Sequence, residues 1–119
     1  MSLNLGSSEV DAAAVLEAVA ANDVDFLALP ELNPVTLERL EQAGIARLLP
    51  YPGTDVDWAN VGNGIFPVFP LTTPGRVPGS GFFQSRPAAE VRGIPGGIRL
   101  TSVHVNSPRP GHVPRWPWT

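Results

Sequence analysis

The chain has 119 residues, of which 43% are hydrophobic and 16% charged, and its formal net charge is −3. This length suits one domain with a single core, and the apolar content excludes a disordered polypeptide. The absence of cysteine excludes a disulfide scaffold, a zinc–thiolate site and a thiol nucleophile. No apolar run reaches the roughly 18 residues that a membrane span needs. The 12 glycines and 14 prolines are concentrated after residue 50 and predict many turns and short strands.

The charged residues are divided unevenly along the chain. Residues 1–57 carry ten acidic and two basic side chains, a balance of −8, whereas residues 58–119 carry one acidic residue and six arginines, a balance of +5. Two interpretations stay open: the halves attract each other within one domain, or the basic half carries a surface that faces anions. The candidates for a phosphate-facing surface are Arg86, Arg92, Arg99, Arg109 and Arg115. For Arg92 and Arg99, which flank a predicted hairpin tip, simple exposure to solvent is the alternative.

The first half of the chain predicts a helix, a buried strand and a second helix. Asp11 is a suitable N-cap for an alanine-rich helix over residues 12–21. The nearly continuous apolar run 24–29 indicates a strand that is buried on both faces and ends at Pro30-Glu31. Helices and a strand in this order are typical of an α/β domain.

The second helix has clear boundaries in the sequence. Asn33 is its expected N-cap, Pro34 its first residue, and Gly44 follows its last turn. The spacing of its apolar residues predicts one buried face. That face contains Val35, Leu37, Leu40 and Ala43.

The second half of the chain predicts shorter elements. Residues 64–69 form a candidate strand, which Pro67 restricts to a sheet edge or a bulge. Residues 72–81 are rich in proline and glycine and predict a loop. Two arms, 88–92 and 98–105, predict a β-hairpin around a Pro-Gly-Gly turn.

Several familiar motifs are missing from the sequence. It contains no G-x-S-x-G, P-loop, H-E-x-x-H or strand-linked G-x-G-x-x-G pattern, which argues against the enzyme classes that depend on them. Gly62-Asn63-Gly64 predicts only a turn. The proline-rich tail, 106–119, predicts an extended segment in which His112 is exposed.

Three polar residues lie at or just beyond the predicted strands. Asn4 follows the start of the chain, Glu31 ends the first buried strand, and His104 lies near the end of the 98–105 arm. In open α/β sheets, functional sites commonly lie at strand ends, because the sheet directs the side chains while the loops leave room for a ligand. These three residues are therefore the candidates for a functional site.

For Glu31 and His104 the residue pattern leaves two interpretations each. A carboxylate that directly follows a buried strand needs a partner, and a hard cation such as Mg²⁺ is a common one. The alternative is that Glu31 interacts with the amides that open the 34–43 helix. His104 alternates with Val103 and Val105, so it faces the opposite side of the strand. It is either a core-edge histidine or a general acid or donor to a phosphoryl oxygen.

Read in order, these residues resemble the endonuclease/exonuclease/phosphatase superfamily, which has the fold of pancreatic deoxyribonuclease. Asn4, the 12–21 helix and the segment V-D-F-L-A-L-P-E-L at 24–32 resemble its opening strand, helix and second strand. The segment L-T-S-V-H-V-N-S-P-R-P-G at 100–111 resembles a later strand that ends in histidine, followed by a proline-containing loop. With Trp116 shortly after, this loop is similar to that of a bacterial, often actinobacterial, branch. The resemblance covers most of the chain through short motifs.

The resemblance implies a metal-dependent phosphodiesterase or phosphatase that uses Mg²⁺ or Mn²⁺. Glu31 would bind the metal together with Asn4, which would also lie beside the phosphate, and His104 would assist the leaving group or the scissile phosphate. Glu31 and His104 are thus the implied catalytic residues, and a phosphate ester is the implied substrate. Nucleic acid is a further candidate partner, although the net charge is negative and no lysine is present.

The fold implied is α/β (α+β): the N-terminal half of a two-layer deoxyribonuclease-like α/β sandwich, with a mixed sheet and helices on one face. Residues 1–119 would form one partial domain. The sequence departs from the family pattern at Pro30, where a glutamine is usual, and at Val68-Phe69, where Ser-Arg is usual. The later Gly-Asp-x-Asn and Ser-Asp-His motifs are absent.

These departures favour a second hypothesis, from a different functional class. Without the motifs that supply the water-activating aspartate, the chain is expected to lose several orders of magnitude in rate. An uncovered sheet would also expose apolar faces and unpaired edges. The alternative to an enzyme is therefore a non-catalytic interaction module that self-associates, as a homodimer, through that sheet face.

Overall fold

The structure is a computed structural model that describes residues 1–6, 9–59, 61–80, 82–87, 91 and 94–105. Within this part of the chain, two α-helices and two three-stranded antiparallel sheets form a small α+β domain. The elements in chain order are α1 (Ala12–Ala21), β1 (Phe26–Pro30), α2 (Pro34–Ala43), the 3-10 helix η1 (Ile45–Arg47), β2 (Gly53–Asp55), β3 (Asn63–Pro67), β4 (Leu71–Arg76), β5 (Phe83–Pro87) and β6 (Leu100–Ser102).

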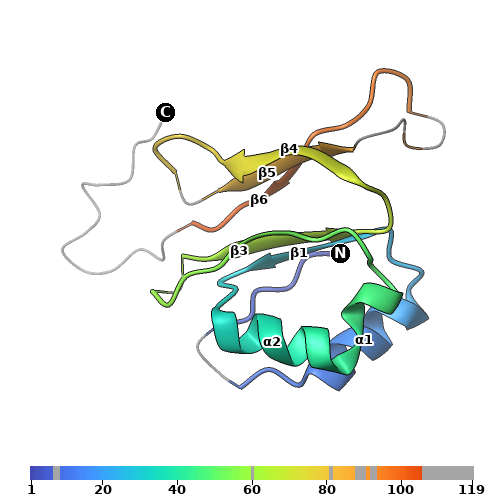
Figure 1. The fold of residues 1–119 in the computed structure, drawn as a ribbon, viewed down its shortest axis with the longest axis vertical. Coiled ribbons are helices and arrows are strands. Elements are labelled where there is room, and N and C mark those ends of the chain that lie inside the picture. Colours follow the sequence, from blue (N-terminus) through green and yellow to red (C-terminus); the bar gives the residue numbers. More distant parts are fainter. Residues whose placement is uncertain (7–8, 60, 81, 88–90, 92–93, 106–119) are drawn as a thin grey trace.

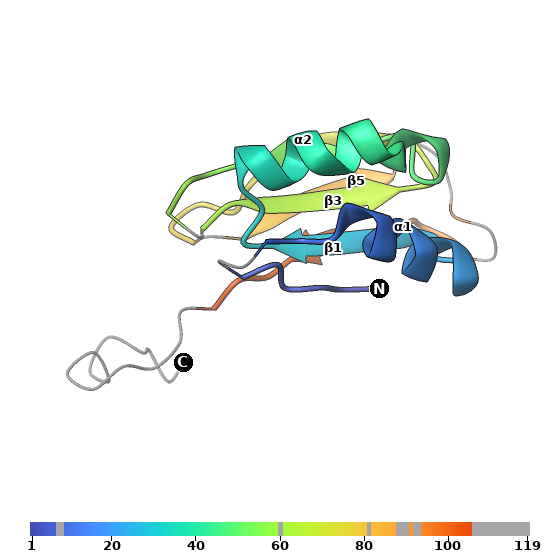
Figure 2. The same cartoon turned by 90° about the horizontal axis from the view of Figure 1, so that it is seen from below.

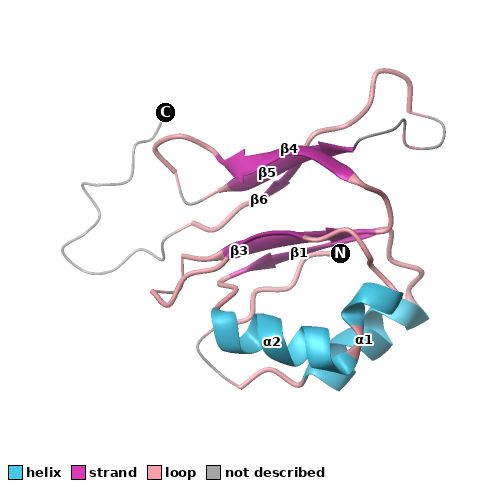
Figure 3. Cartoon of the chain, in the orientation of Figure 1, coloured by secondary structure: helices cyan, strands magenta, loops and turns pink. Residues whose placement is uncertain are grey.

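The elements lie in three layers (Figures 1 and 3). We call the sheet of order β1-β3-β2 the inner sheet and the sheet of order β4-β5-β6 the outer sheet. Both helices cover one face of the inner sheet, and the outer sheet packs on its other face (Figures 1 and 2). In the described part of the chain, no helix is long and apolar enough to cross a membrane.

The inner sheet is buried on both faces because it lies between two hydrophobic clusters. Phe66 belongs to the cluster that includes Val19 and Leu40 of the helices, and the adjacent Ile65 belongs to the cluster with Phe83 and Leu100 of the outer sheet. Successive side chains of a strand point to opposite faces, so β3 contributes to both clusters. Its neighbour β1 is likewise buried, as the apolar run predicted.

Both helices have the predicted bounds, because local side chains cap them. The Asp11 carboxylate accepts a hydrogen bond from the Ala14 N–H at 3.2 Å, and the Asn33 side chain accepts one from the Thr36 N–H at 2.8 Å. Gly44 ends α2 in the left-handed conformation, with φ 95°. The helical part of the prediction is confirmed.

The buried face of α2 differs from the predicted one. Thr36 and Leu40 are buried, with 4% and 0% of their surface exposed, whereas Val35 is 42% exposed. Thr36 and Leu40 are four residues apart and therefore share one face of the helix. Val35 lies about 100° around the helix from Thr36 on the side away from Leu40, and therefore outside the buried face.

The strands differ more from the sequence prediction. β3 begins at Asn63, where a turn was predicted, and it is the central strand of the inner sheet rather than an edge strand. Pro67 is tolerated there because it is the last residue of β3. The Val68 N–H points to β1, where it donates to the Asp25 carbonyl at 2.9 Å. Successive N–H groups of a strand point to opposite sides, so an N–H at position 67 would point away from β1. The strand on that side, β2, pairs with β3 only over residues 63–65, so Pro67 removes no sheet hydrogen bond.

The predicted loop and hairpin are both partly wrong. Residues 71–76 form β4, with a register shift between Thr72 and Gly75 that accommodates Pro74. The partner of β6 is β5, over 83–87, rather than 88–92. Most of the 88–92 arm lies outside the described residues, as does the tail 106–119.

The prediction of a mixed sheet is also wrong. All pairings between the named strands are antiparallel, and they form two sheets. A parallel contact is made by residues 1–5, which run beside β1: the Leu3 N–H donates to the Ala28 carbonyl at 3.0 Å, and the Leu5 N–H to the Pro30 carbonyl at 3.3 Å. This contact carries Asn4 to the end of β1.

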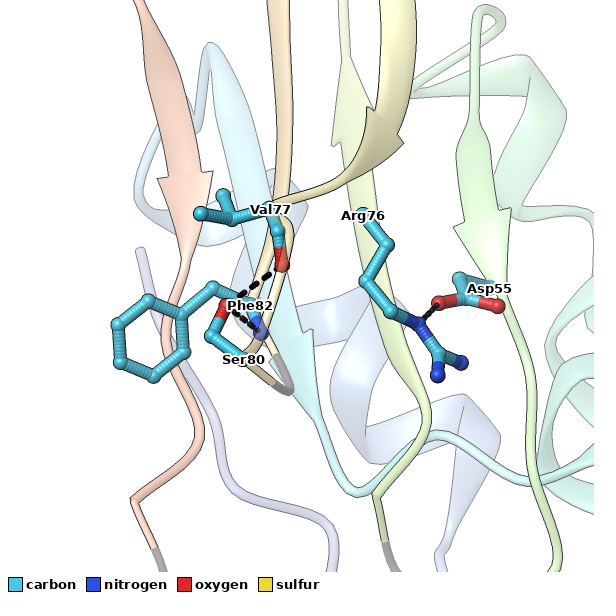
Figure 4. A network of polar contacts seen from close by, with 5 residues as sticks. All are labelled: Asp55, Arg76, Val77, Ser80 and Phe82. Carbon is cyan, nitrogen blue, oxygen red and sulfur yellow. Dashed lines mark hydrogen bonds and ion pairs between the residues drawn. The ribbon is translucent and has the colours of Figure 1, made fainter.

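A polar contact at the edge of the sandwich joins the two sheets (Figure 4). Arg76 at the end of β4 donates through Nε to Asp55 Oδ2 of β2 at 2.7 Å. The hydrogen bond and the negative charge of Asp55 raise the pKa of Arg76 above its usual value. In the following turn, the Ser80 hydroxyl donates to the Val77 carbonyl and accepts from the Phe82 N–H. These contacts fix the start of the β4–β5 hairpin beside the inner sheet.

We expect Gly62→Ala to destabilise the domain by about 2 kcal/mol or more. A Cβ at Gly62 would overlap the Leu32 carbonyl oxygen and lie 2.6 Å from the Asp57 nitrogen, so the backbone would have to move. The matched control is Gly75→Ala, because no atom lies within 4 Å of a Cβ at that position. Urea denaturation of the two variants measures the difference, and equal stabilities would contradict this account of Gly62.

Candidate functional site

The structure brings together the three residues that sequence analysis selected. Asn4 Nδ2 donates a hydrogen bond to Glu31 Oε1 at 3.1 Å, and His104 Nδ1 lies 3.6 Å from the same oxygen. The side chains of His104 and Glu31 are only 12% and 17% exposed. Residues from three separate parts of the chain therefore meet at one carboxylate oxygen near the surface.

The amide of Asn4 has a defined orientation in this cluster. Its Oδ1 accepts a hydrogen bond from the Gly6 N–H at 2.8 Å, while its Nδ2 donates to Glu31. A flipped amide would place oxygen against the carboxylate and nitrogen against an N–H, so both contacts support the same assignment. In this geometry Asn4 holds the Glu31 carboxylate in place.

Glu31 occupies a backbone conformation that is unfavourable for a side chain other than glycine. Its φ is 63°, in the left-handed region, which costs roughly 1–2 kcal/mol. The next residue, Leu32, is fully buried and held on both sides: its N–H donates to the Gly62 carbonyl at 3.1 Å, and its carbonyl accepts from the Asp57 N–H at 3.3 Å. Backbone strain of this kind clusters at functional sites, where surrounding structure enforces it.

The alternative role of Glu31 as a helix-entry carboxylate finds no support in its contacts. The first turn of α2 contains no acidic residue, and its Thr36 N–H is capped by Asn33. Among the described residues, the contacts of Glu31 Oε1 are with Asn4 and His104. The carboxylate is therefore directed to the strand ends rather than to the helix.

A buried polar pair that sequence analysis missed lies directly behind the site. Ser102 Oγ of β6 donates to Asn63 Oδ1 of β3 at 2.7 Å, and both residues are buried. Ser102 is two residues before His104, and Asn63 pairs with Pro30, the residue before Glu31. The hydrogen bond thus joins the two sheets at the point from which the site residues extend.

Part of this pair was visible in the sequence. Leu100 and Ser102 alternate with Thr101 along β6, and the alternation places Ser102 on the same face as the apolar Leu100. A hydroxyl on a core-facing position predicts a polar partner. The partner itself, Asn63, was hidden because the glycines beside it suggested a turn.

The donor set of the site limits which metal ion it fits. The described residues contain no group of three or more histidine, aspartate or glutamate side chains that could hold a metal ion. Mg²⁺ is commonly held by one or two carboxylates together with water and phosphate oxygens. Glu31 fits that simpler requirement as the single protein carboxylate.

The candidate phosphate-facing arginines do not join this cluster. Arg86 and Arg99 are exposed on the outer sheet, and the β6 strand separates Arg99 from His104. Arg92, Arg109 and Arg115 lie outside the described residues, as do His112 and Trp116. The site within the described chain therefore consists of Asn4, Glu31 and His104.

No protein-family profile, curated protein or solved structure matches this chain. The likeness to the endonuclease/exonuclease/phosphatase superfamily therefore depends on the motifs in the sequence. The activity and the substrate have to be argued from the residues of the site.

We expect Glu31→Gly to be more stable than Glu31→Ala by about 1 kcal/mol. Both variants remove the carboxylate and its contacts with Asn4 and His104, so the difference isolates the cost of a Cβ at φ 63°. Chemical denaturation of the two proteins under identical conditions measures it. Equal stabilities would mean that the left-handed backbone at this position carries no strain.

We expect Ser102→Ala to lower the free energy of unfolding by about 1–3 kcal/mol, because it removes a buried hydrogen bond to Asn63. The control is Thr101→Ala, the exposed neighbour on the same strand. Thermal and urea unfolding compare the two. A Ser102→Ala variant as stable as the control would show that the cross-sheet hydrogen bond is not needed.

Proposed function

We propose that the chain is a Mg²⁺- or Mn²⁺-dependent phosphoesterase with a fold of the endonuclease/exonuclease/phosphatase type. The observation that carries the proposal is the convergence of Asn4 and His104 on one carboxylate oxygen of Glu31, at 3.1 and 3.6 Å. The resemblance of segments 24–32 and 100–111 to the motifs of that superfamily supports it. Glu31 is the proposed metal ligand.

Asn4 acts in this proposal by orienting the carboxylate. Its Nδ2 occupies one side of Glu31 Oε1, and its Oδ1 is held by the Gly6 N–H. Nothing among the described residues hydrogen-bonds to Glu31 Oε2, which leaves that oxygen for a cation. The direct metal contact that the resemblance implies for Asn4 stays a prediction.

His104 is the proposed proton donor to the leaving group. Its Nδ1 lies 3.6 Å from Glu31, which is too long for a hydrogen bond but close enough to orient the ring. With Nδ1 directed at the carboxylate, Nε2 is the nitrogen left to contact a phosphate oxygen. In hydrolysis, water adds to phosphorus and the ester P–O bond breaks, and the departing oxygen takes a proton from His104. The proton that the added water loses passes to solvent, from which His104 is protonated again.

A bound Mg²⁺ would supply charge stabilisation at the phosphoryl oxygens. The chain's own residues would hold the carboxylate, orient the imidazole and exclude part of the solvent, since both side chains are largely buried. The motifs with the water-activating aspartate are absent from the sequence. We therefore expect turnover about 10²–10⁴-fold below that of a site with a general base.

The interaction-module hypothesis is less well supported. It needs an uncovered apolar sheet face, but the outward side chains of the outer sheet are polar: Thr72, Gln84, Arg86 and Thr101. The hypothesis also assumed that the sheet lacks a covering partner, but β1 is buried between the helices and the outer sheet (Figure 1). Apolar exposure near the outer sheet occurs at Val103 and Val105, beyond the end of β6.

The test is hydrolysis of bis(p-nitrophenyl) phosphate by the purified chain with Mg²⁺ or Mn²⁺, before and after addition of EDTA. We expect slow, metal-dependent turnover that Glu31→Gln reduces about 100-fold or more. The control, Glu17→Gln, removes an exposed carboxylate on α1 and should leave the rate unchanged. Circular dichroism of both variants verifies the fold.

Two results would contradict the proposal. One is hydrolysis that persists in Glu31→Gln or in EDTA. The other is absence of turnover combined with absence of Mn²⁺ binding, measured by electron paramagnetic resonance of the free ion. Mn²⁺ binding that is lost in Glu31→Gln would locate the metal site independently of the rate.

A further inference from the structure

The outward face of the outer sheet carries a second arrangement of polar side chains. Along β5, Phe83 and Ser85 are buried and Arg86 is exposed, and along β6, Leu100 and Ser102 are buried while Thr101 is exposed. This alternation directs Arg86 to the side away from the inner sheet. Arg99, next to the inward-facing Leu100, is exposed on the same side.

Two observations bring the two arginines near each other. β5 and β6 pair with Phe83 opposite Ser102 and with Ser85 opposite Leu100, and Arg86 and Arg99 are the next residues beyond that pairing. Both also line one depression. Like charges close together on neighbouring chain segments repel, and an anion between the two side chains would offset that repulsion.

The groups around the arginines are also hydrogen-bond donors. A shallow depression on this face is lined by Thr73, Gln84, Ser85, Arg86 and Arg99, none of them acidic. No ion pair of Arg86 or Arg99 occurs among the described residues. Guanidinium groups bind oxyanions through paired N–H donors.

The backbone beneath the depression is held firmly. The Ser85 hydroxyl donates to the Thr72 carbonyl at 2.8 Å, and the Thr72 hydroxyl donates to the Arg86 carbonyl at 3.3 Å. These contacts tie β5 to β4 across the irregular register next to Thr73. The backbone that carries Arg86 is therefore fixed in the hairpin.

We propose that Arg86 and Arg99 form a binding site for the phosphate group, on the outer face of the outer sheet. The two guanidinium groups bind the oxyanion from opposite sides, and Gln84 and Thr73 contribute an amide and a hydroxyl donor. Arg99 precedes β6 and His104 follows it, so this site lies at the other end of the strand from Glu31. The proposal does not depend on the phosphoesterase activity.

The test is a titration of the ¹⁵N-labelled protein with inorganic phosphate at constant ionic strength, with chloride as the replaced anion. We expect the Nε–Hε signals of Arg86 and Arg99 to shift and to saturate. Arg47, an exposed arginine of η1 on the helix side, is the internal control and should shift only slightly and linearly. Shifts of Arg86 and Arg99 no larger than that of Arg47 would overturn the proposal.

The variant Arg99→Gln tests whether the two arginines bind one anion together or act independently. Arg99→Gln should weaken the phosphate dependence of the Arg86 signal by about three- to tenfold, whereas Arg47→Gln should leave it unchanged. An unchanged Arg86 titration in Arg99→Gln would also overturn the proposal. Because both arginines are exposed, the amide spectrum should show that the fold is retained.

A second ligand identifies the source of the phosphate group. Glycerol 1-phosphate binding as tightly as inorganic phosphate would indicate the phosphate group of a larger molecule. Much weaker binding of the ester would indicate free phosphate. Both titrations run in EDTA, so a metal-dependent active site does not contribute to the signal.

Discussion

The hydrogen bond between Ser102 and Asn63 is the contact on which the geometry of the site depends. The apolar contacts among Ile65, Phe83 and Leu100 hold the two sheets together, but hydrophobic burial has no preferred direction. A buried hydroxyl–amide bond of 2.7 Å does. Ser102 is two residues before His104, and Asn63 pairs with Pro30, the residue before Glu31. This hydrogen bond therefore fixes the relative position of the two strands that carry Glu31 and His104.

The turn at Glu31 shows how this geometry is maintained against local preference. A glycine would adopt φ 63° without strain, yet a glutamate occupies the position. The backbone is held because Leu32 is buried and hydrogen-bonded on both sides, and because Gly62 lets two chain segments approach closely. The burial and hydrogen bonds of Leu32 therefore hold the Glu31 carboxylate near the surface in spite of the backbone strain.

The uneven charge distribution has more than one structural consequence. Arg76 of the basic half pairs with Asp55 of the acidic half and ties the outer sheet to the inner one. Arg86 and Arg99 instead face outward from the opposite side of the sheet and form no ion pair among the described residues. The attraction between the two halves is therefore seen at Arg76, whereas an anion-facing surface at Arg86 and Arg99 is our proposal.

The sequence by itself determined the helices and identified the three polar residues of the candidate site. Asp11, Asn33 and Gly44 act within a few residues of themselves, so their signals are readable without the fold. Strands β4 and β5 escaped prediction because they form a hairpin with an irregular register, in which strand pairing overrode the prolines and glycines of residues 72–81. The convergence of residues 4, 31 and 104 on one oxygen, and the buried pair behind them, were decided by the packing of two sheets. Local sequence carries no information about such distances, because they arise only when separate strands are brought into register.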